Sequence, residues 1–268
     1  MILNASIYWS SSEEKDVLLL VQELLRSNHI FHIYLLDTSE QPQPERRWHH
    51  RVKYLHFGTN IGRAAAHNIA IRESIYDDIP FHLVISPNVV VKAEAVENLL
   101  AVMLSEGLIG QLLPRVVDAD ERLQHVCRLL PTPYDLFRSA LGGVGSASRS
   151  IARYALRDKD YSRPINAPCL SGCFMLLRTE ALLKVGLFDE QFITCCEDID
   201  LCRRLHRDYL TLYYPSETII YPQHPSSDRN EQISWASMAD IVRYFNKWGW
   251  LYDTERRRMN NRVLGGEL

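Results

Sequence analysis

Three carboxylates that could carry out catalysis fall within four positions of the chain: Glu197, Asp198 and Asp200. Apolar residues recur every three positions from Ile199 to Leu205, so the acids are expected in the first turn of a helix. Free N–H groups and the helix dipole favour negative charge at that place. An ionised carboxylate at the lip of a cleft can act as a general base. The competing interpretation is that the acids cap the helix, although a cap requires only one of them.

The composition is that of a soluble globular protein and points to no nucleic-acid partner. The chain has 268 residues, of which 46% are hydrophobic and 24% charged. Its net charge of −3 and pI of about 6.4 provide no global basic field. The six cysteines include no C-x-x-C pair, which favours reduced thiols. Without a signal-peptide pattern or an apolar run of the ~20 residues that span a bilayer, we expect a cytoplasmic protein, at most attached to a membrane surface.

Apolar and amphipathic stretches alternate through the first part of the chain. Strands are expected at residues 5–9, 31–36, 53–57, 81–85 and 109–113, with helices after the first, third and fourth of them. Continuous apolar strands in β-α-β order predict an α/β fold with a mainly parallel central sheet and helices on both faces.

This alternation stops at residue 114. Residues 114–166 are rich in proline, glycine and arginine, and so long an irregular stretch is usually functional or partly disordered. A strand is then expected at 169–177, a short helix at 180–185 and short strands at 211–214 and 218–221. A final amphipathic helix is expected from 235 to about 250, and a basic, mobile tail from 255 onwards.

Polar residues follow the carboxyl ends of the predicted strands, where open α/β sheets bind ligands. Asp37 follows the second strand, Asn60 the third and Asn88 the fourth. Each has a structural alternative, such as an Asx turn at Asp37 or a turn cap at Asn88. Because they converge on one edge of one sheet, we predict a binding site there.

The segment from Asn60 to Asn68 indicates which ligand this edge suits. It lacks the G-x-G-x-x-G pattern of nicotinamide binders and the G-K-[ST] of a P-loop. Its two asparagine amides and the cation of Arg63 suit a nucleoside diphosphate better than a redox dinucleotide. Gly62 also has a structural alternative, which is close packing of a helix on a strand.

Taken in order, these segments form a set of motifs: the strand ending at Asp37, Asn60-Ile61-Gly62 through Ala66-His67-Asn68, Pro87-Asn88-Val89, Ser171-Gly172-Cys173-Phe174-Met175-Leu176, Gly186-Leu187-Phe188-Asp189-Glu190, Glu197-Asp198-Ile199-Asp200-Leu201-Cys202-Arg203-Arg204-Leu205, and His224 before Ser226-Ser227. On these motifs, the chain resembles family 2 glycosyltransferases of the GT-A fold. Within that family it is most similar to rhamnosyltransferases that extend lipid-linked O-antigen.

The resemblance implies an organisation and an activity. Residues 1–113 would form a Rossmann-like nucleotide-sugar-binding half, 114–228 an acceptor-binding and catalytic half, and 229–268 a helical segment with a basic tail. The implied reaction is inverting transfer of a sugar, most simply rhamnose from dTDP-rhamnose, to a hydroxyl of a bacterial surface polysaccharide. The implied partners are a dTDP- or UDP-linked donor and a glycan or polyprenyl-diphosphate-linked acceptor. A homodimer and peripheral contact with the cytoplasmic face of the inner membrane stay open.

The resemblance also assigns roles to residues. Asp198 would be the general base, with Glu197 as the competing choice and Asp200 as an orienting or structural acid. The residues expected along the nucleotide sugar are Asp37, Asn60, Gly62, Arg63, Asn68 and Asn88. Those expected at the acceptor are Gly172 and Asp189.

One position departs from the family pattern. The family commonly has Asn-Pro-Asp after the fourth strand, whereas this chain has Ser86-Pro87-Asn88. A neutral amide is a weaker ligand for Mg²⁺ or Mn²⁺ than a carboxylate. Three outcomes stay open: metal binding through Asn88, His224 and the donor diphosphate; stabilisation of the leaving group by cations such as Arg63 or Arg229; or a catalytically impaired nucleotide-sugar-binding or scaffold protein.

Overall fold

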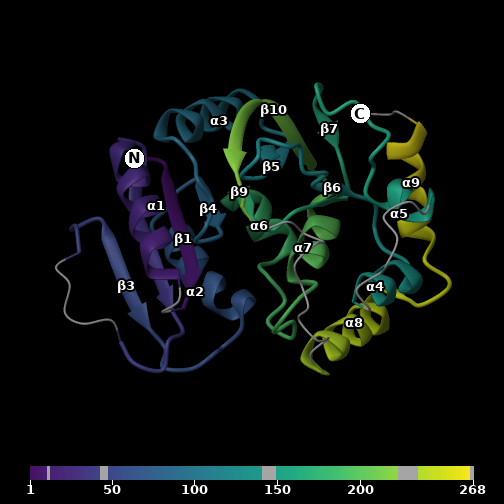
Figure 1. Cartoon of the computed structure of the whole chain (residues 1–268), viewed down its shortest axis with the longest axis horizontal. Coiled ribbons are helices and arrows are strands. Elements are labelled where there is room, and N and C mark those ends of the chain that lie inside the picture. Colours follow the sequence, from purple (N-terminus) through teal and green to yellow (C-terminus); the bar gives the residue numbers. More distant parts are fainter. Residues whose placement is uncertain (11–12, 43–47, 141–148, 223–234, 266–268) are drawn as a thin grey trace.

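An eight-stranded sheet extends through the whole structure in the order β3-β2-β1-β4-β9-β5-β10-β7 (Figure 1). The computed structural model describes all residues except 11–12, 43–47, 141–148, 223–234 and 266–268. The strands are β1 (Leu3–Trp9), β2 (Ile30–Asp37), β3 (Val52–His56), β4 (Phe81–Ile85), β5 (Ile109–Val117), β7 (Ile165–Asn166), β9 (Phe174–Arg178) and β10 (Leu210–Ile220). Only β9 and β7 are antiparallel to their neighbours in this sheet. The predicted mainly parallel sheet is therefore confirmed.

Two layers of helices cover the sheet. Helices α1 (Glu14–Arg26) and α3 (Ala93–Ser105) pack together in one layer. Helices α2 (Arg63–Tyr76), α6 (Thr179–Val185) and α7 (Glu197–Leu205) form the other. Every residue of β4 is buried, as expected of a strand covered on both faces. None of the described helices combines the length and the apolar character needed to cross a membrane.

The strand ends that the sequence predicts to be functional lie at one edge of the sheet. The parallel strands β1, β2, β4, β5 and β10 all end at this edge, and β9 begins there. The starts of helices α2 and α7 meet at this edge as well. Gly62, just before α2, packs against Ile193, just before α7. The predicted convergence of the polar segments on one edge therefore agrees with the topology.

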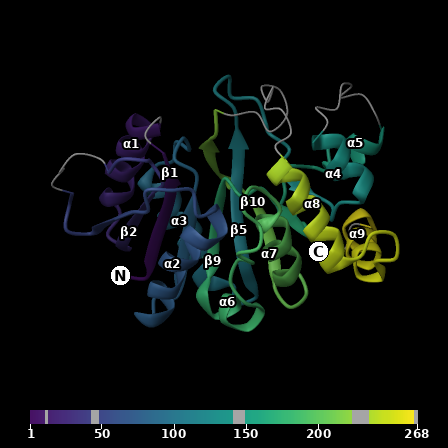
Figure 2. The same ribbon diagram turned by 90° about the horizontal axis from the view of Figure 1, so that it is seen from below.

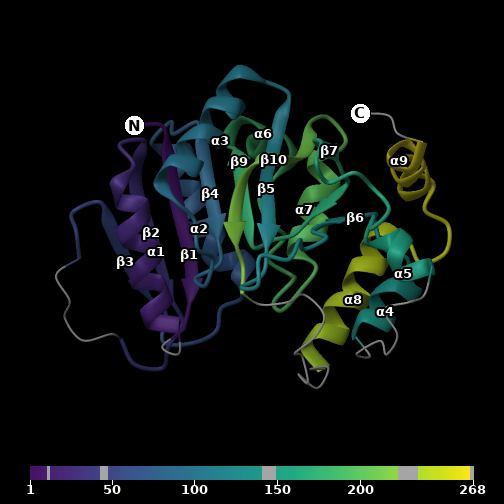
Figure 3. The ribbon, with the colours of Figure 1, turned by 45° about the horizontal axis from the view of Figure 1, so that its top comes forward.

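Elements from the middle of the chain and from its C-terminal part form a group at one end of the molecule (Figure 3). The group contains α4 (Pro133–Ala140), α5 (Arg149–Tyr154), α8 (Trp235–Trp248) and α9 (Thr254–Gly265), beside a two-stranded sheet of β6 (Cys127–Arg128) and β8 (Cys169–Leu170). The prediction of a mobile tail from 255 is wrong. Residues 254–265 are a helix, because Glu255 bonds to Arg203 and Arg207 and Met259 is buried.

Three other boundaries differ from the predicted ones. The strand expected at 169–177 is divided into β8 and β9 by a turn at 171–173. The two strands expected around Pro215 form the single strand β10, whose register shifts between Tyr214 and Thr218. Strand β5 continues to Val117, so it crosses the boundary that was predicted between residues 113 and 114.

A chain of buried polar side chains connects β1, α2 and β4. The Ser6 hydroxyl lies 2.8 Å from His67 Nδ1 and 2.8 Å from His82 Nε2. The Ser74 hydroxyl lies 2.7 Å from His82 Nδ1 and accepts a bond from Asn4. Burial lowers the pKa of His82 to about 3, so this imidazole is neutral in the folded protein.

The stability of the protein is therefore expected to fall at mildly acidic pH. Below pH ~6.5 the unfolded chain protonates His82 while the folded chain does not, so the free energy of unfolding decreases as pH falls towards 3. At pH 5 this histidine accounts for a loss of about 2 kcal/mol. The free energy of unfolding is measured with urea at pH 7.5 and at pH 5. Its decrease between the two pH values should be smaller in His82→Gln than in the wild type by that amount. The exposed His29→Gln is the control, and an unchanged slope in His82→Gln would contradict the argument.

Candidate active site

The three acids at the start of α7 point into three different surroundings. The helix begins after Cys196, a non-glycine residue in the left-handed conformation with φ of 74°. Glu197 is 6% exposed and Asp200 is fully buried, whereas Asp198 is partly exposed. Of the three acids, Asp198 is therefore the most accessible to a substrate.

Asp200 is a structural acid. One of its oxygens lies 2.9 Å from Arg204 Nε, and the other accepts from Trp248 Nε1 at 2.8 Å and from Lys247 Nζ at 2.8 Å. Arg204 in turn donates to the backbone carbonyls of residues 185–187, at the end of α6. The carboxylate thus joins α6, α7 and α8, which lie side by side (Figure 2).

Asn68 and Asp189, which the sequence predicted at the nucleotide and the acceptor, bond to other parts of the protein. The buried Asn68 amide donates to the Phe188 carbonyl and to Glu190, and its oxygen accepts from Phe188 N–H. These bonds attach α2 to the segment before α7 and leave the Asn68 NH₂ group no proton for a nucleotide. Asp189 forms an ion pair with Lys247 at 2.7 Å, which lowers the pKa of its carboxyl although burial opposes the shift. Both side chains are therefore bonded within the protein, and their predicted roles stay predictions.

Asp198 lies against the turn between β8 and β9. Its Oδ1 accepts from the N–H of Ile199 at 2.8 Å. A β-carbon at Gly172 would lie 3.0 Å from its Oδ2, closer than nine in ten such contacts. The predicted acceptor residue Gly172 thus makes room for the Asp198 carboxylate.

Glu197 faces Arg63 at the start of α2. The Arg63 guanidinium lies 3.6 Å from Glu197 Oε1, and Glu197 Oε2 has no hydrogen-bond partner among the described residues. Burial raises the pKa of Glu197, Arg63 opposes that shift, and Asp198 adds to it. Glu197 is less accessible to an acceptor hydroxyl than the partly exposed Asp198, and its carboxylate already faces a cation.

The donor side of the site contains Asp37 and Asn60. Asp37 is buried in an Asx turn, where it accepts from Ser39 N–H at 2.8 Å and from the Tyr54 hydroxyl at 2.5 Å. Two of its three described bonds, both from Ser39, go to Oδ1, so Oδ2 can accept one more bond beside that from Tyr54. Asn60 is exposed, and its oxygen accepts from Gly62 N–H and from the Tyr8 hydroxyl, both at 2.9 Å. The NH₂ group of Asn60 therefore points away from Gly62 and Tyr8.

Arg128 is a site residue that the sequence did not single out. It belongs to β6 and pairs with Cys169 of β8, the strand just before Gly172. Although burial works against the charged form, Tyr154, Cys169 and Asp198 raise the pKa of Arg128. The carboxylates of Glu197 and Asp198 likewise raise the pKa of Arg63 against the effect of burial. Two cations therefore lie within electrostatic range of Asp198. Six other arginines lie between 115 and 157, and the sequence could not distinguish Arg128 from them because its pairing with β8 is not local in sequence.

The turn that contains Asn88 lies beside the same acids. Ser86 N–H donates to the Cys173 carbonyl at 2.9 Å, next to Gly172. Among the residues described, no group of three or more His, Cys, Asp or Glu side chains is arranged to hold a metal ion. His224 and Arg229 lie outside the described residues. Asn88 is a neutral amide, and metal binding through Asn88 and His224 stays a prediction.

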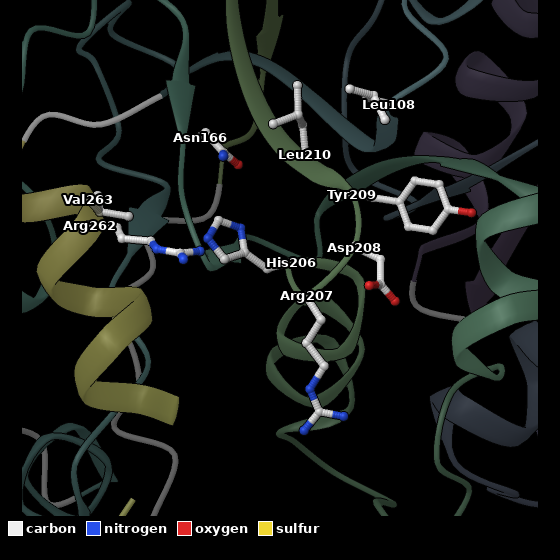
Figure 4. Close-up of a pocket in the computed structure, with 9 residues that line it drawn as sticks. All are labelled: Leu108, Asn166, His206, Arg207, Asp208, Tyr209, Leu210, Arg262 and Val263. Carbon is white, nitrogen blue, oxygen red and sulfur yellow. The ribbon is translucent and has the colours of Figure 1, made fainter. Parts of the chain in front are cut away.

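A cavity of about 330 Å³ lies elsewhere, between α9 and the start of β10 (Figure 4). Leu108 and Leu210, which line it, mark the amino ends of β5 and β10. Figure 4 shows the His206 and Arg262 side chains pointing toward each other across it. Because this edge of the sheet is opposite the acids, the cavity is not part of the candidate site.

Comparison with known proteins points to glycosyltransferases. The chain is 27% identical to the N-acetylglucosaminyl-diphospho-decaprenol L-rhamnosyltransferases of two Mycobacterium tuberculosis strains, CDC 1551 / Oshkosh and ATCC 25618 / H37Rv. Each alignment covers 72% of this chain and 66% of the relative, which is slightly less than two thirds of the relative's length. No protein-family model matches the chain.

Solved structures share the fold at low identity. GalNAc-T7 with UDP, GalNAc and Mn²⁺ has a TM-score of 0.62 at 14% identity, over 92% of this chain and 48% of that one. S. aureus TarS 1-349 has a TM-score of 0.54 at 13% identity, over 98% and 71%. The mannosyltransferase PcManGT from Pyrobaculum calidifontis, in complex with GDP-Man and Mn²⁺, has 0.54 at 10%, over 99% and 74%. The comparisons confirm the predicted GT-A fold and the predicted resemblance to rhamnosyltransferases, and they agree with the prediction of a glycosyltransferase.

Removal of the Asp200 carboxylate should destabilise the protein strongly. Asp200→Ala leaves a buried guanidinium without its partner, and the expected loss is about 3–5 kcal/mol in the free energy of unfolding, measured in urea. The control is Asp120→Ala, because that carboxylate is 66% exposed in its ion pair with Arg122 and its loss should have little effect. Equal stability of the two variants would show that Asp200 does not hold the helices together.

Proposed function

We propose that the chain is an inverting glycosyltransferase with Asp198 as its general base. The observation that carries this proposal is the position of Asp198. It is the accessible acid of the three, it lies against Gly172, and Arg63 of the predicted donor-binding segment is close to it. The confirmed fold and the rhamnosyltransferase relatives support the same class of reaction.

The reaction can be written with the residues present. Asp198 takes the proton of the acceptor hydroxyl as its oxygen attacks the anomeric carbon of the donor sugar. The bond from that carbon to the diphosphate breaks on the opposite face, which inverts the configuration. Negative charge grows on the leaving nucleoside diphosphate, and Arg63 and Arg128 stabilise it.

The identities of the donor and the acceptor are inferred from the rhamnosyltransferase relatives. Their name describes transfer of L-rhamnose to a diphospho-decaprenol-linked sugar. We therefore infer a dTDP-rhamnose donor and a polyprenyl-diphosphate-linked acceptor in the synthesis of a surface polysaccharide such as O-antigen. Such an acceptor implies peripheral contact with the cytoplasmic face of the inner membrane. A homodimer is compatible with this function but is not required by it.

A second candidate function is a non-catalytic nucleotide-sugar-binding or scaffold protein. The observation that favours it is Asn88, a neutral residue where the family commonly has an aspartate. The accessible Asp198 favours catalysis, because a protein that only binds a nucleotide sugar needs no base.

Replacement of the base should separate chemistry from binding. Asp198→Asn is expected to reduce kcat for sugar transfer by roughly 10²- to 10⁴-fold, because general-base catalysis contributes that much. Donor binding, followed by thermal shift, should be preserved. Glu197→Gln and the exposed Asp120→Asn are the comparison variants. Near-normal turnover in Asp198→Asn together with a large loss in Glu197→Gln would move the role of base to Glu197.

Nucleotide binding is expected to be independent of metal. Since Arg63 and Arg128 can meet the negative charge of the diphosphate, dTDP or UDP should raise the melting temperature to the same extent with Mn²⁺ and with a chelator. Arg63→Gln and Arg128→Gln should each weaken that shift. A shift that appears only with Mn²⁺ would instead favour metal binding through Asn88, His224 and the donor diphosphate.

A further inference from the structure

One carboxylate of α8 holds the backbone that leads into the catalytic acids. Asp240 is fully buried, and its Oδ2 accepts three bonds from successive N–H groups: Ile193 at 3.0 Å, Thr194 at 2.7 Å and Cys195 at 3.2 Å. Its Oδ1 accepts from Arg243 on the same helix at 2.6 Å. The contact therefore joins two elements that are more than forty residues apart in sequence.

The geometry is that of an anion-binding nest. Successive backbone N–H groups that converge on one point form a concavity for a negative charge, as in many phosphate sites. Here a side chain of the protein occupies the concavity. Charge-assisted bonds of this kind are roughly twice as strong as neutral ones, and buried carboxylates require them. Residues 193–195 are thus fixed to α8 rather than free to follow their local preferences.

The nest segment lies between the donor side and the acids. A β-carbon at Gly62 would lie 3.3 Å from Ile193 Cα, so the predicted donor-binding segment packs directly on the nest. On the other side, Cys195 is followed by the left-handed Cys196 and then by Glu197 and Asp198. A displacement of the nest would consequently move the acids relative to the donor.

The other contacts of α8 differ from this one, although Cys195 Sγ also lies 3.7 Å from the Ser237 carbonyl oxygen. Lys247 and Trp248 bond to Asp200, one turn inside α7, and so they orient the body of that helix. Asp240 fixes the segment through which the chain enters α7. The two attachments together define both the direction of α7 and the position of its first turn.

We propose that Asp240 is a positioning residue that sets the distance between the Asp198 carboxylate and the donor, an inference that rests on the proposed function. It acts through the backbone of residues 193–195 and touches no substrate. Its removal should therefore lower kcat while the KM for the donor changes little.

The test is Asp240→Ala with chemical rescue. The variant leaves an empty nest, and kcat should fall roughly 10²-fold, as expected for misplacement of about 1 Å. Added formate, a free carboxylate that can occupy the nest, should restore a substantial part of the lost kcat. Formate should have no such effect on the wild type or on Asp198→Asn. The control on the same helix is Val242→Ala, an exposed position at which kcat should be unchanged.

A second measurement does not depend on activity. Hydrogen exchange at the amides of residues 193–195 should be slow in the wild type, faster in Asp240→Ala and slow again with formate. If the wild type transfers no sugar, the proposed function fails while the exchange data still decide whether the nest exists. If Asp240→Ala does not fold, Asp240→Asn replaces it, with an expected partial loss of kcat and no gain from formate.

Two results would overturn the proposal. The first is a kcat within twofold of the wild type in Asp240→Ala when exchange at 193–195 has increased, since the nest would then not position the base. The second is recovery of slow exchange with formate but no recovery of kcat.

Discussion

The buried ion pair between Asp200 and Arg204 is the contact on which the rest of the site depends. Both groups lie one turn apart on α7, and Asp200 is fully buried. Arg204 satisfies three carbonyls at the end of α6, and Trp248 and Lys247 bring α8 to the opposite side of Asp200. A buried charge is stable only when it is paired and fully bonded, so these helices have to assemble together. The proposed catalytic residue is carried on a helix whose orientation is fixed by residues that take no part in the reaction.

Neighbouring acids in one helical turn acquire different roles because the helix turns about 100° per residue. Asp198 is directed to the open side at Gly172, Glu197 to the guanidinium of Arg63, and Asp200 to the interior. Asp198 combines the two interpretations of the sequence, because its Oδ1 accepts from the first-turn N–H of Ile199 while the residue stays partly exposed. The residue before the helix, the left-handed Cys196, makes no side-chain cap bond.

The sequence predicted what depends on local pattern. Strand β4 coincides with the predicted residues 81–85, and the polar ends of the strands meet at one edge as parallel topology requires. It did not predict contacts between residues that are far apart in the chain. Asn68 bonds to Phe188, 120 positions away, and Glu255 stabilises α9 through Arg203, 52 positions away. Motif membership could not reveal the partners of Asn68 and Asp189 within the protein, and spacing could not distinguish Arg128 from the arginines around it.

The place of β9 has a consequence for how the chain can acquire its structure. This strand, residues 174–178, lies between β4 and β5 and pairs with both. The sheet of the N-terminal half is therefore interrupted until a segment from the other half is inserted into it. Pairings over such sequence distances form slowly, because a long loop has to close before any contact is gained. The strands β1 to β4 alone would leave β4 as an open edge, so we expect them to complete their folding together with β9 and β5 as one cooperative unit.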